Sequence, residues 1–174
     1  MNSVVELISR KESITLEFKS DQGPLGDSDL IDAVVCLANA QGGHLLIGVE
    51  DDGTVTGLHT LHQTRPEQLA ALIANRTVPP IQVSVDFVDI NVQDAHTQVA
   101  VVVVPTSTQP AATSSGRLLI RYLDSRGKPG CRPLYPNELS SWQTDRGQLD
   151  ISAQVVSGTN WDDLDPLEFE RLRR

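Results

Sequence analysis

The segment ESITLEFKS, residues 12–20, combines carboxylates and a lysine in a pattern that suits phosphodiester cleavage. Alternate side chains of a strand face opposite ways, so Glu17 and Lys19 share one polar face, which we expect to be open to solvent. A carboxylate can bind a divalent cation that activates water, while an ammonium group stabilises negative charge developing at phosphorus. The pattern therefore makes Glu17 and Lys19 candidate catalytic residues. The alternative is a structural role, an ion pair on the surface of the strand.

A single carboxylate does not hold a hard ion such as Mg²⁺ usefully, so further oxygen ligands are needed. Glu12 precedes the strand, and Asp51 follows the apolar segment LLIGVE at the mouth of an expected hairpin. We therefore take Glu12, Glu17 and Asp51 as candidate ligands of Mg²⁺ or Mn²⁺. Glu50 and Asp52 are the neighbouring alternatives to Asp51.

Charge is distributed unevenly along the chain. Its 174 residues include 14 Lys and Arg against 23 Asp and Glu, and the net charge of -9 argues against coating nucleic acid by bulk electrostatics. Basic residues are nevertheless concentrated in residues 117–132, where only Asp124 opposes them. We expect a hairpin here, a mobile cationic arm that reaches phosphates, with Tyr122 or Tyr135 stacking on a base; the alternative is a solvated loop. The candidate nucleic-acid-binding residues are Arg117, Arg121, Arg126, Lys128 and Arg132.

Periodicity and stop signals predict both helices and strands along the chain. With 39% hydrophobic residues the chain can bury one core, so we expect a single domain over residues 1–150 and a tail or linker over residues 151–174 that leads toward a further region. The expected helices cover residues 4–10, 30–40 and 64–76, with a short one capped by Asn137. The expected strands cover residues 14–19, 81–90 and 99–105, together with hairpins over residues 44–58 and 117–132.

The two cysteines predict no disulfide framework. Cys36 lies in an apolar helical run and Cys131 in a loop, so we expect a buried thiol and an incidental one. No apolar run approaches membrane-spanning length and no signal-peptide pattern is visible, so we expect a cytoplasmic protein that does not engage a membrane. The last segment, NWDDLDPLEFERLRR, begins a helix without a stop signal, which suggests a longer protein or a docking tail.

Three separated motifs together resemble the Schlafen AlbA_2 domain family, over roughly residues 7–142. They are ESITLEFK, then ANAQGGHLLIGVEDDGTVTGL, and then LLIRYLDS with NEL after a strand ending in VVVVP. The resemblance implies a compact α+β fold with a mixed β-sheet and packed helices. It also implies, as in Schlafen endoribonucleases, a three-carboxylate metal site that cuts structured RNA such as tRNA. It implies Glu12, Glu17 and Asp51 as these carboxylates and Lys19 as the motif lysine, with Glu50 where the family usually has aspartate. The family's two-lobed cleft implies a homodimer.

Three functions stay open at this point. The first is a nucleic-acid-binding domain with a divalent-metal-dependent endonuclease site for RNA. The second is a non-catalytic DNA-binding or sensor module at the amino terminus of a larger transcriptional regulator or ATPase-like protein. The third is a protein-interaction or oligomerisation domain. Metal-dependent cutting supports the first function, and salt-sensitive binding without cutting supports the second.

Overall fold

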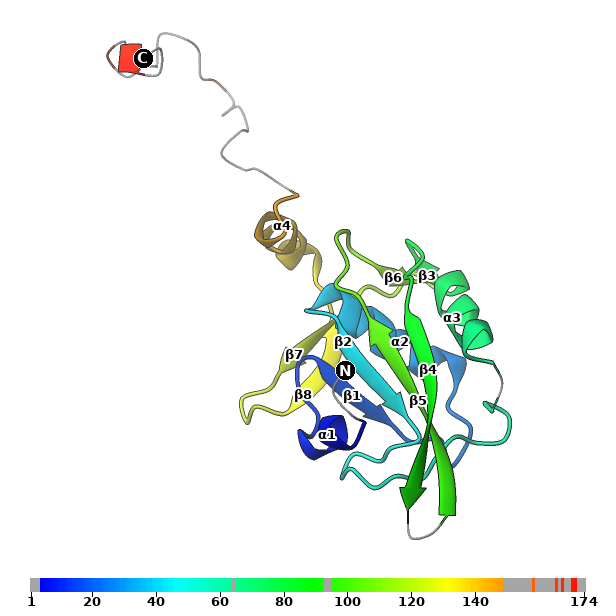
Figure 1. The fold of residues 1–174 in the computed structure, drawn as a ribbon. Helices are drawn as coiled ribbons and strands as arrows, with labels where there is room; N and C mark the ends of the chain where they lie inside the picture. Colours follow the sequence, from blue (N-terminus) through cyan, green and yellow to red (C-terminus); the bar gives the residue numbers. More distant parts are fainter. Residues whose placement is uncertain are drawn as a thin grey trace.

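The structure is a computed structural model that describes residues 4–63, 65–92 and 95–148, and residues 158, 165, 167, 170 and 171. The tail expected over residues 151–174 therefore lies largely outside the described residues. In the described ranges no helix combines the length and the apolar character needed to cross a membrane. The helices are α1 (Val4–Ser9), α2 (Asp27–Asn39), α3 (Pro66–Asn75) and α4 (Pro136–Asp145). The strands, shown with them in Figure 1, are β1 (Leu16–Lys19), β2 (Gly43–Ile47), β3 (Thr77–Val78), β4 (Ser84–Val92), β5 (Ala95–Val104), β6 (Ala112–Thr113), β7 (Leu119–Leu123) and β8 (Pro129–Pro133).

A mixed sheet with the strand order β1-β2-β5-β4 forms the centre of the fold. β1 and β2 are parallel, whereas β2 with β5 and β5 with β4 are antiparallel. Because parallel neighbours need a crossover connection, α2 lies between β1 and β2 in the chain. β7 and β8 form a separate hairpin, as the sequence predicts, and β3 pairs with β6. The expected α+β fold with a mixed sheet is confirmed.

Helices α2 and α3 cover one face of this sheet. Val34 and Leu37 of α2 and Ile73 of α3 are fully buried in one cluster with Leu45 and Val102 of the sheet. α2 is apolar around most of its second half, which is the pattern of a helix enclosed on several sides. It is enclosed because the β7–β8 hairpin packs against it as well.

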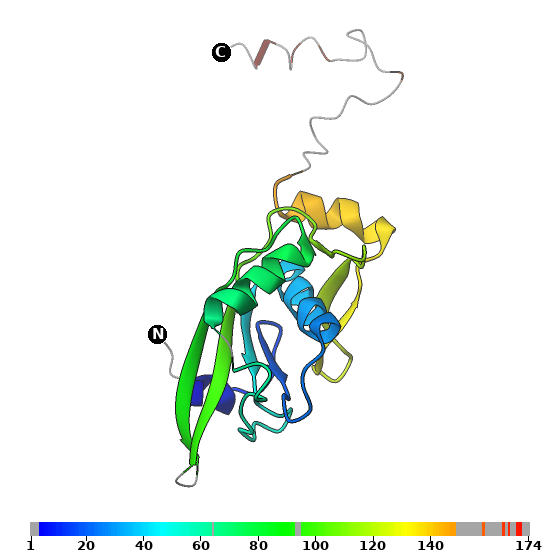
Figure 2. The same cartoon turned by 90° about the vertical axis from the view of Figure 1, so that its right-hand side faces the viewer.

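Helix α1 covers the opposite face of the sheet, so that Figure 2 shows α1 and α2 on different sides of it. Leu7 of α1 packs in a second cluster with Phe18, Leu46 and Val99. The central strands are thus covered on both faces, which explains the continuous apolar run of β5. Phe18 of β1 faces the α1 side of the sheet. Because side chains alternate along a strand, its neighbour Glu17 faces the α2 side.

The hairpin expected over residues 44–58 is wrong in its second half. The chain after β2 returns only as far as an isolated bridge between Val49 and Val55. β2 already has β1 and β5 as its two neighbours, so no edge remains for a returning strand. The loop instead crosses itself closely: a Cβ on Gly48, whose φ is +94°, would lie 2.6 Å from the carbonyl carbon of Gly57. Only glycine fits at this crossing.

The start of α4 also differs from the expected cap at Asn137. Tyr135 is the N-cap residue, and Pro136 occupies the first turn, where its missing N–H costs no hydrogen bond. The carboxylate of Glu138 accepts a hydrogen bond from the Tyr135 N–H at 3.1 Å. The proline therefore moves the helix start to a position before the residue that the sequence suggested.

The two cysteines form a disulfide, which corrects the expectation of two separate thiols. Cys36 is fully buried in α2, and Cys131 lies on β8. Their Cα atoms are 5.9 Å apart, within the usual range for disulfides, although 95 positions separate them in the chain. The bond ties the β7–β8 hairpin to α2.

Candidate functional site at the open edge of strand β1

β1 is an edge strand, with β2 on one side only. The open edge of such a strand presents backbone groups that need partners. Glu12 Oε1 accepts a hydrogen bond from the Phe18 N–H at 3.1 Å, and Arg121 Nη2 donates to the Leu16 carbonyl at 2.9 Å. Arg121 Nε also donates to the Ser13 carbonyl at 2.7 Å. Two side chains therefore close the edge of β1 and are fixed in place by it.

Glu17 is buried between two cations. The residue is 8% exposed, and Arg121, which pairs with its Oε2, is 4% exposed. Lys19 Nζ lies 2.5 Å from Glu17 Oε1. The expected open polar face is thus wrong for Glu17, because Arg121 reaches over it from β7. A buried carboxylate is tolerated only with such close partners.

The charges of two other predicted carboxylates act on Glu12. Burial is the main cause that raises the pKa of Glu12, against the lowering effect of its hydrogen bond from the Phe18 N–H. The negative charges of Glu17 and Asp51 raise the pKa of Glu12 further, and the charge of Arg121 lowers it. Since charges act on each other strongly only at short range, Glu12, Glu17 and Asp51 share one region.

The carboxylates as they are placed do not fit a divalent ion. Among the described residues no three Asp, Glu, His or Cys side chains are arranged to hold a metal. Both oxygens of Glu17 are engaged by Lys19 and Arg121, and one oxygen of Glu12 accepts a backbone hydrogen bond. A metal ion would have to compete with these partners for its ligands.

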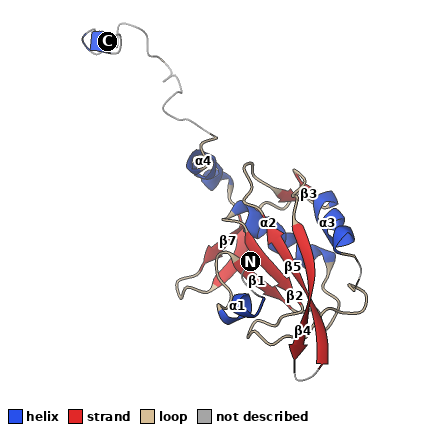
Figure 3. Cartoon of the chain, in the orientation of Figure 1, coloured by secondary structure: helices blue, strands red, loops and turns tan. Residues whose placement is uncertain are grey.

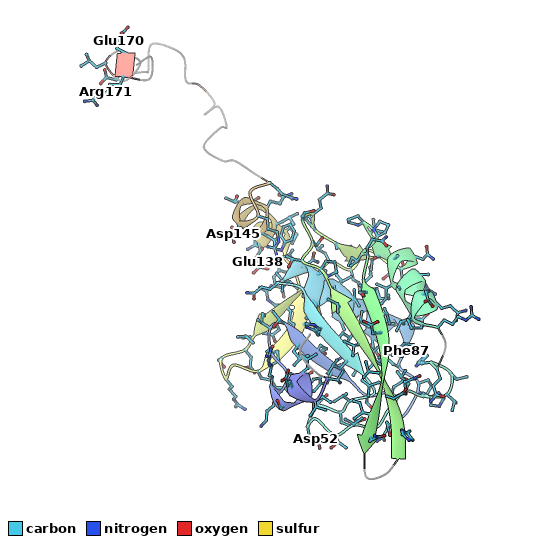
Figure 4. The ribbon with its side chains drawn as sticks, in the orientation of Figure 1. Asp52, Phe87, Glu138, Asp145, Glu170 and Arg171 are labelled. Atoms are coloured by element: carbon cyan, nitrogen blue, oxygen red, sulfur yellow. A yellow bond between two sulfur atoms is a disulfide. The ribbon has the colours of Figure 1, made fainter. Side chains whose placement is uncertain are left out.

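The neighbours of Asp51 hold the loop that carries it. Thr56 Oγ1 donates a hydrogen bond to Glu50 at 2.7 Å. The Thr54 N–H donates to Asp52 at 2.8 Å and is the main cause that lowers the pKa of Asp52. Figure 4 shows Asp52 at the outer edge of the molecule, on this exposed loop. Both alternatives to Asp51 therefore have local structural roles.

A cleft of about 330 Å³ opens beside the motif, between β1, α2 and the β7–β8 hairpin. Helix α2 contributes Asp29 and Asp32 to this cleft. Sequence reasoning missed both residues, although their spacing of three positions places them on one helix face. Burial raises the pKa of Asp32, whose Oδ1 has no hydrogen-bond partner among the described residues. The charged residues that line the cleft are Glu17, Lys19, Asp29, Asp32, Arg121 and Arg132.

Two of the five basic residues assigned to nucleic acid pair with other parts of the domain. Arg121 is buried against β1, which corrects its expected place on an exposed arm. Arg117 Nη1 lies 2.6 Å from Asp32 Oδ2, and its Nη2 donates to Ser28 at 2.7 Å. These two arginines fasten the β7–β8 hairpin to the sheet and to α2.

Of the other three basic residues, two lie at the turn of the hairpin and Arg132 lies on β8. Arg126 and Lys128 are exposed at its turn, where both backbone N–H groups donate to Asp124 at 2.8 Å. Both side chains extend from a turn whose backbone is held by the Asp124 carboxylate. In Figure 3 this turn lies at the edge of the molecule away from α3.

Arg132 lies between two exposed aromatic rings. Its guanidinium carbon is 5.8 Å from the ring centre of Tyr122 and 5.6 Å from that of Tyr135. Glu138 binds the guanidinium through both oxygens, at 2.7 and 2.8 Å, and this pairing lowers the pKa of Glu138. Gly130 leaves room for the Tyr122 ring, since a Cβ there would lie 3.0 Å from it. The Arg132 guanidinium therefore contacts both tyrosine rings, and both rings remain exposed to solvent.

Replacing Glu12 with glutamine is expected to stabilise the protein at neutral pH and to have little effect in acid. Because the folded-state pKa is raised, the contribution of Glu12 to stability is full below its ordinary pKa of 4.5 and is lost as pH rises through the folded value. Glutamine keeps an oxygen for the Phe18 N–H and removes the charge. Chemical unfolding at about pH 4 and about pH 7 measures the difference.

Glu67→Gln, on the exposed side of α3, is the matched control for this change. An equal increase in the free energy of unfolding in both variants at each pH would show that the buried location of Glu12 has no effect of its own on stability. A loss of stability in Glu12→Gln at neutral pH would contradict the assigned burial cost.

The fold and the edge of β1 define a class, an α+β domain that carries a Glu-x-Lys motif on an edge strand beside a basic hairpin. The family model described as "Schlafen, AlbA_2" matches residues 12–129, and the chain belongs to this family. The family is associated with nucleic acids. The chain is also similar to the crystal structure of the DIP2311 protein from Corynebacterium diphtheriae, with 27% identity and a TM-score of 0.57. That similarity covers 92% of this chain but only 29% of the other protein.

Proposed function

We propose that this domain binds single-stranded nucleic acid through the outer side of the β7–β8 hairpin and does not need cleavage to do so. The observation that carries the proposal is the arginine held between two exposed tyrosine rings beside a turn with two exposed cations. We call this region the hairpin surface. Its residues are Tyr122, Arg126, Lys128, Arg132 and Tyr135.

Both parts of the hairpin surface suit a single strand. Aromatic rings offer faces on which unpaired bases stack, and each stacked base contributes about 1–3 kcal/mol to binding. Arg126 and Lys128 supply the charge for phosphates, and their release of counterions makes binding sensitive to salt. The net charge of -9 repels phosphate over much of the remaining surface, which favours this one region.

Replacing Arg126 and Lys128 together with alanine is expected to weaken binding and to reduce its salt dependence. Each phosphate contact on a single strand contributes about 0.7 to the slope of log K against log salt, so the slope should fall by about 1.4. Fluorescence anisotropy with labelled single-stranded RNA, single-stranded DNA and tRNA, at several salt concentrations, measures both effects.

Arg65→Ala is the matched control, because Arg65 is exposed at the start of α3, away from the hairpin. Tyr135→Ala tests stacking separately and should weaken binding without changing the salt slope. An unchanged slope in the double variant, or an equal loss in Arg65→Ala, would contradict the proposal.

A metal-dependent endoribonuclease is the second candidate function. The specific observation in its favour is the crowding of negative charge at Glu12 by Glu17 and Asp51, which a divalent ion such as Mg²⁺ or Mn²⁺ would relieve. Glu12, Glu17, Lys19 and Asp51 remain its proposed site residues. It ranks second because both oxygens of Glu17 are already engaged by cations.

Asp51→Asn separates the two candidates, because Asp51 is exposed and its replacement leaves the buried pairs intact. If the domain is a nuclease, Mn²⁺-dependent cutting of labelled tRNA should fall at least about tenfold in Asp51→Asn and persist in Asp52→Asn. Cutting that survives chelator, or that is equal in both variants, would exclude this metal site. Salt-sensitive binding without cutting supports the binding module.

The wider assembly is also a proposal. We propose a module fused to a further region, as in a transcriptional regulator; the DIP2311 protein, of which this chain covers 29%, is the longer protein for comparison. We also propose a homodimer and a cytoplasmic location. The mass of the protein in solution tests the homodimer and a role in protein interaction, and its location in the cell tests the second proposal. A concentration-dependent mass without any nucleic-acid binding would favour the interaction domain.

A further inference from the structure

Asp21 is a fully buried carboxylate that lies outside the site described above. It follows β1 and faces the loop that precedes α3. Its oxygens accept hydrogen bonds from the backbone N–H of Leu25 at 2.8 Å and of His59 at 2.7 Å. The ring Nδ1 of His62 lies 2.8 and 3.0 Å from the same two oxygens. Asp21 therefore joins two loops and fixes an imidazole.

The orientation of His62 leaves its second nitrogen available. A carboxylate accepts hydrogen bonds, so Nδ1 of His62 carries the hydrogen that it shares with Asp21. No described residue hydrogen-bonds to Nε2. The side chain is 34% exposed and lines a cavity, while its hydrogen bonds to Asp21 restrain the ring. An imidazole whose Nδ1 is hydrogen-bonded to a carboxylate has its Nε2 oriented by that bond.

The cavity beside His62 has a volume of about 190 Å³ and mostly aliphatic walls. It lies between α2, α3, the end of β2 and the loops that Asp21 joins. An engineered apolar cavity of about 150 Å³ holds benzene, so this one admits a ring compound of about seven non-hydrogen atoms. The aliphatic walls include Leu25, Leu30, Ile47, Leu58, Leu69 and Leu72.

We propose that this cavity is a binding site for a small hydroxylated ring compound, with the hydroxyl group on Nε2 of His62. A hydroxyl both donates and accepts, so it pairs with Nε2 whether that nitrogen carries a hydrogen or not. A carboxylate ligand is disfavoured because Asp27 lines the cavity and the Asp21 carboxylate lies against His62. Apolar walls with a small number of polar groups, here Asp27, His62 and Gln68, are typical of small-molecule sites.

Phenol and toluene test the proposal, because they have the same size and differ in the hydroxyl group. In a nuclear magnetic resonance titration of the whole chain, phenol should saturate shifts of the Leu25, Leu58 and Leu69 methyl groups with a Kd of about 1 mM or tighter. It should bind about fivefold more tightly than toluene, which is the range of one hydrogen bond. Phenol, and not toluene, should move the Nε2 resonance of His62.

Leu69→Trp should fill the cavity and abolish saturable binding, while Leu123→Trp on the exposed hairpin should leave it unchanged. Should Leu69→Trp not fold, the comparison of phenol with toluene in the unaltered protein still decides. Equal affinities for both compounds, tighter binding of benzoate, or shifts that do not saturate would each overturn the proposal. Shifts that map to another surface would overturn it as well.

Discussion

Replacing Arg121 with methionine is expected to lower the free energy of unfolding by about 3–5 kcal/mol. The change removes the buried partner of Glu17 and leaves that carboxylate with Lys19 alone. It also leaves the carbonyl oxygens of Ser13 and Leu16 without the hydrogen bonds that close the edge of β1. Most of the loss comes from the uncompensated charge, since methionine fills a similar volume. Urea unfolding at neutral pH measures it.

A double variant separates the charge from the packing. Arg121→Met combined with Glu17→Met removes both buried charges, and it should recover about 1–3 kcal/mol relative to Arg121→Met alone. Arg117→Met is the matched control at the start of the same hairpin, because its pair with Asp32 is partly exposed and worth about 1 kcal/mol or less. Equal losses in Arg121→Met and Arg117→Met would show that Glu17 is not buried as described.

Breaking the disulfide is expected to cost about 2–4 kcal/mol of unfolding free energy. Cys36 and Cys131 are 95 positions apart, so their bond restricts a long stretch of the unfolded chain. Cys131→Ser is the suitable variant, because Cys131 lies on an exposed strand and Cys36 stays buried in α2. The variant and the reduced protein should have the same stability.

Thiol titration under denaturing conditions tests the disulfide directly. Protein purified without reductant should show no titratable thiol, and reductant should release two. Reductant should lower the unfolding midpoint of the unaltered protein and leave that of Cys131→Ser unchanged. Two free thiols before reduction, with a midpoint that does not respond to reductant, would contradict the bond.

These two predictions concern the hairpin that also carries the hairpin surface. Arg121 and the disulfide hold it to β1 and to α2, on its inner side. Tyr122, Tyr135, Arg126 and Lys128 are exposed to solvent. Residues of one basic segment therefore divide into those that build the domain and those available to a ligand, and the two groups should respond differently to substitution.

Local pattern alone was sufficient for most of the elements. The apolar spacing over residues 30–40 and 64–76 predicted α2 and α3, and the alternation and apolar runs after residue 80 predicted β4 and β5. The basic hairpin was also predicted in its place. These succeed because helix and strand periods express which side of a segment is buried, and that preference is written within a few neighbouring residues.

The sequence by itself also indicated the family, and it named Glu12, Glu17 and Asp51 as neighbours. Only the tertiary structure decided what surrounds them. The partner of Glu17 comes from a strand about one hundred positions later, as does the other half of the disulfide, and Asp21 meets His62 across a separation of 41. No periodic pattern records such contacts, because they depend on which strand is left at the sheet edge and which hairpin covers it. Burial then turned an expected surface motif into an ion-paired one.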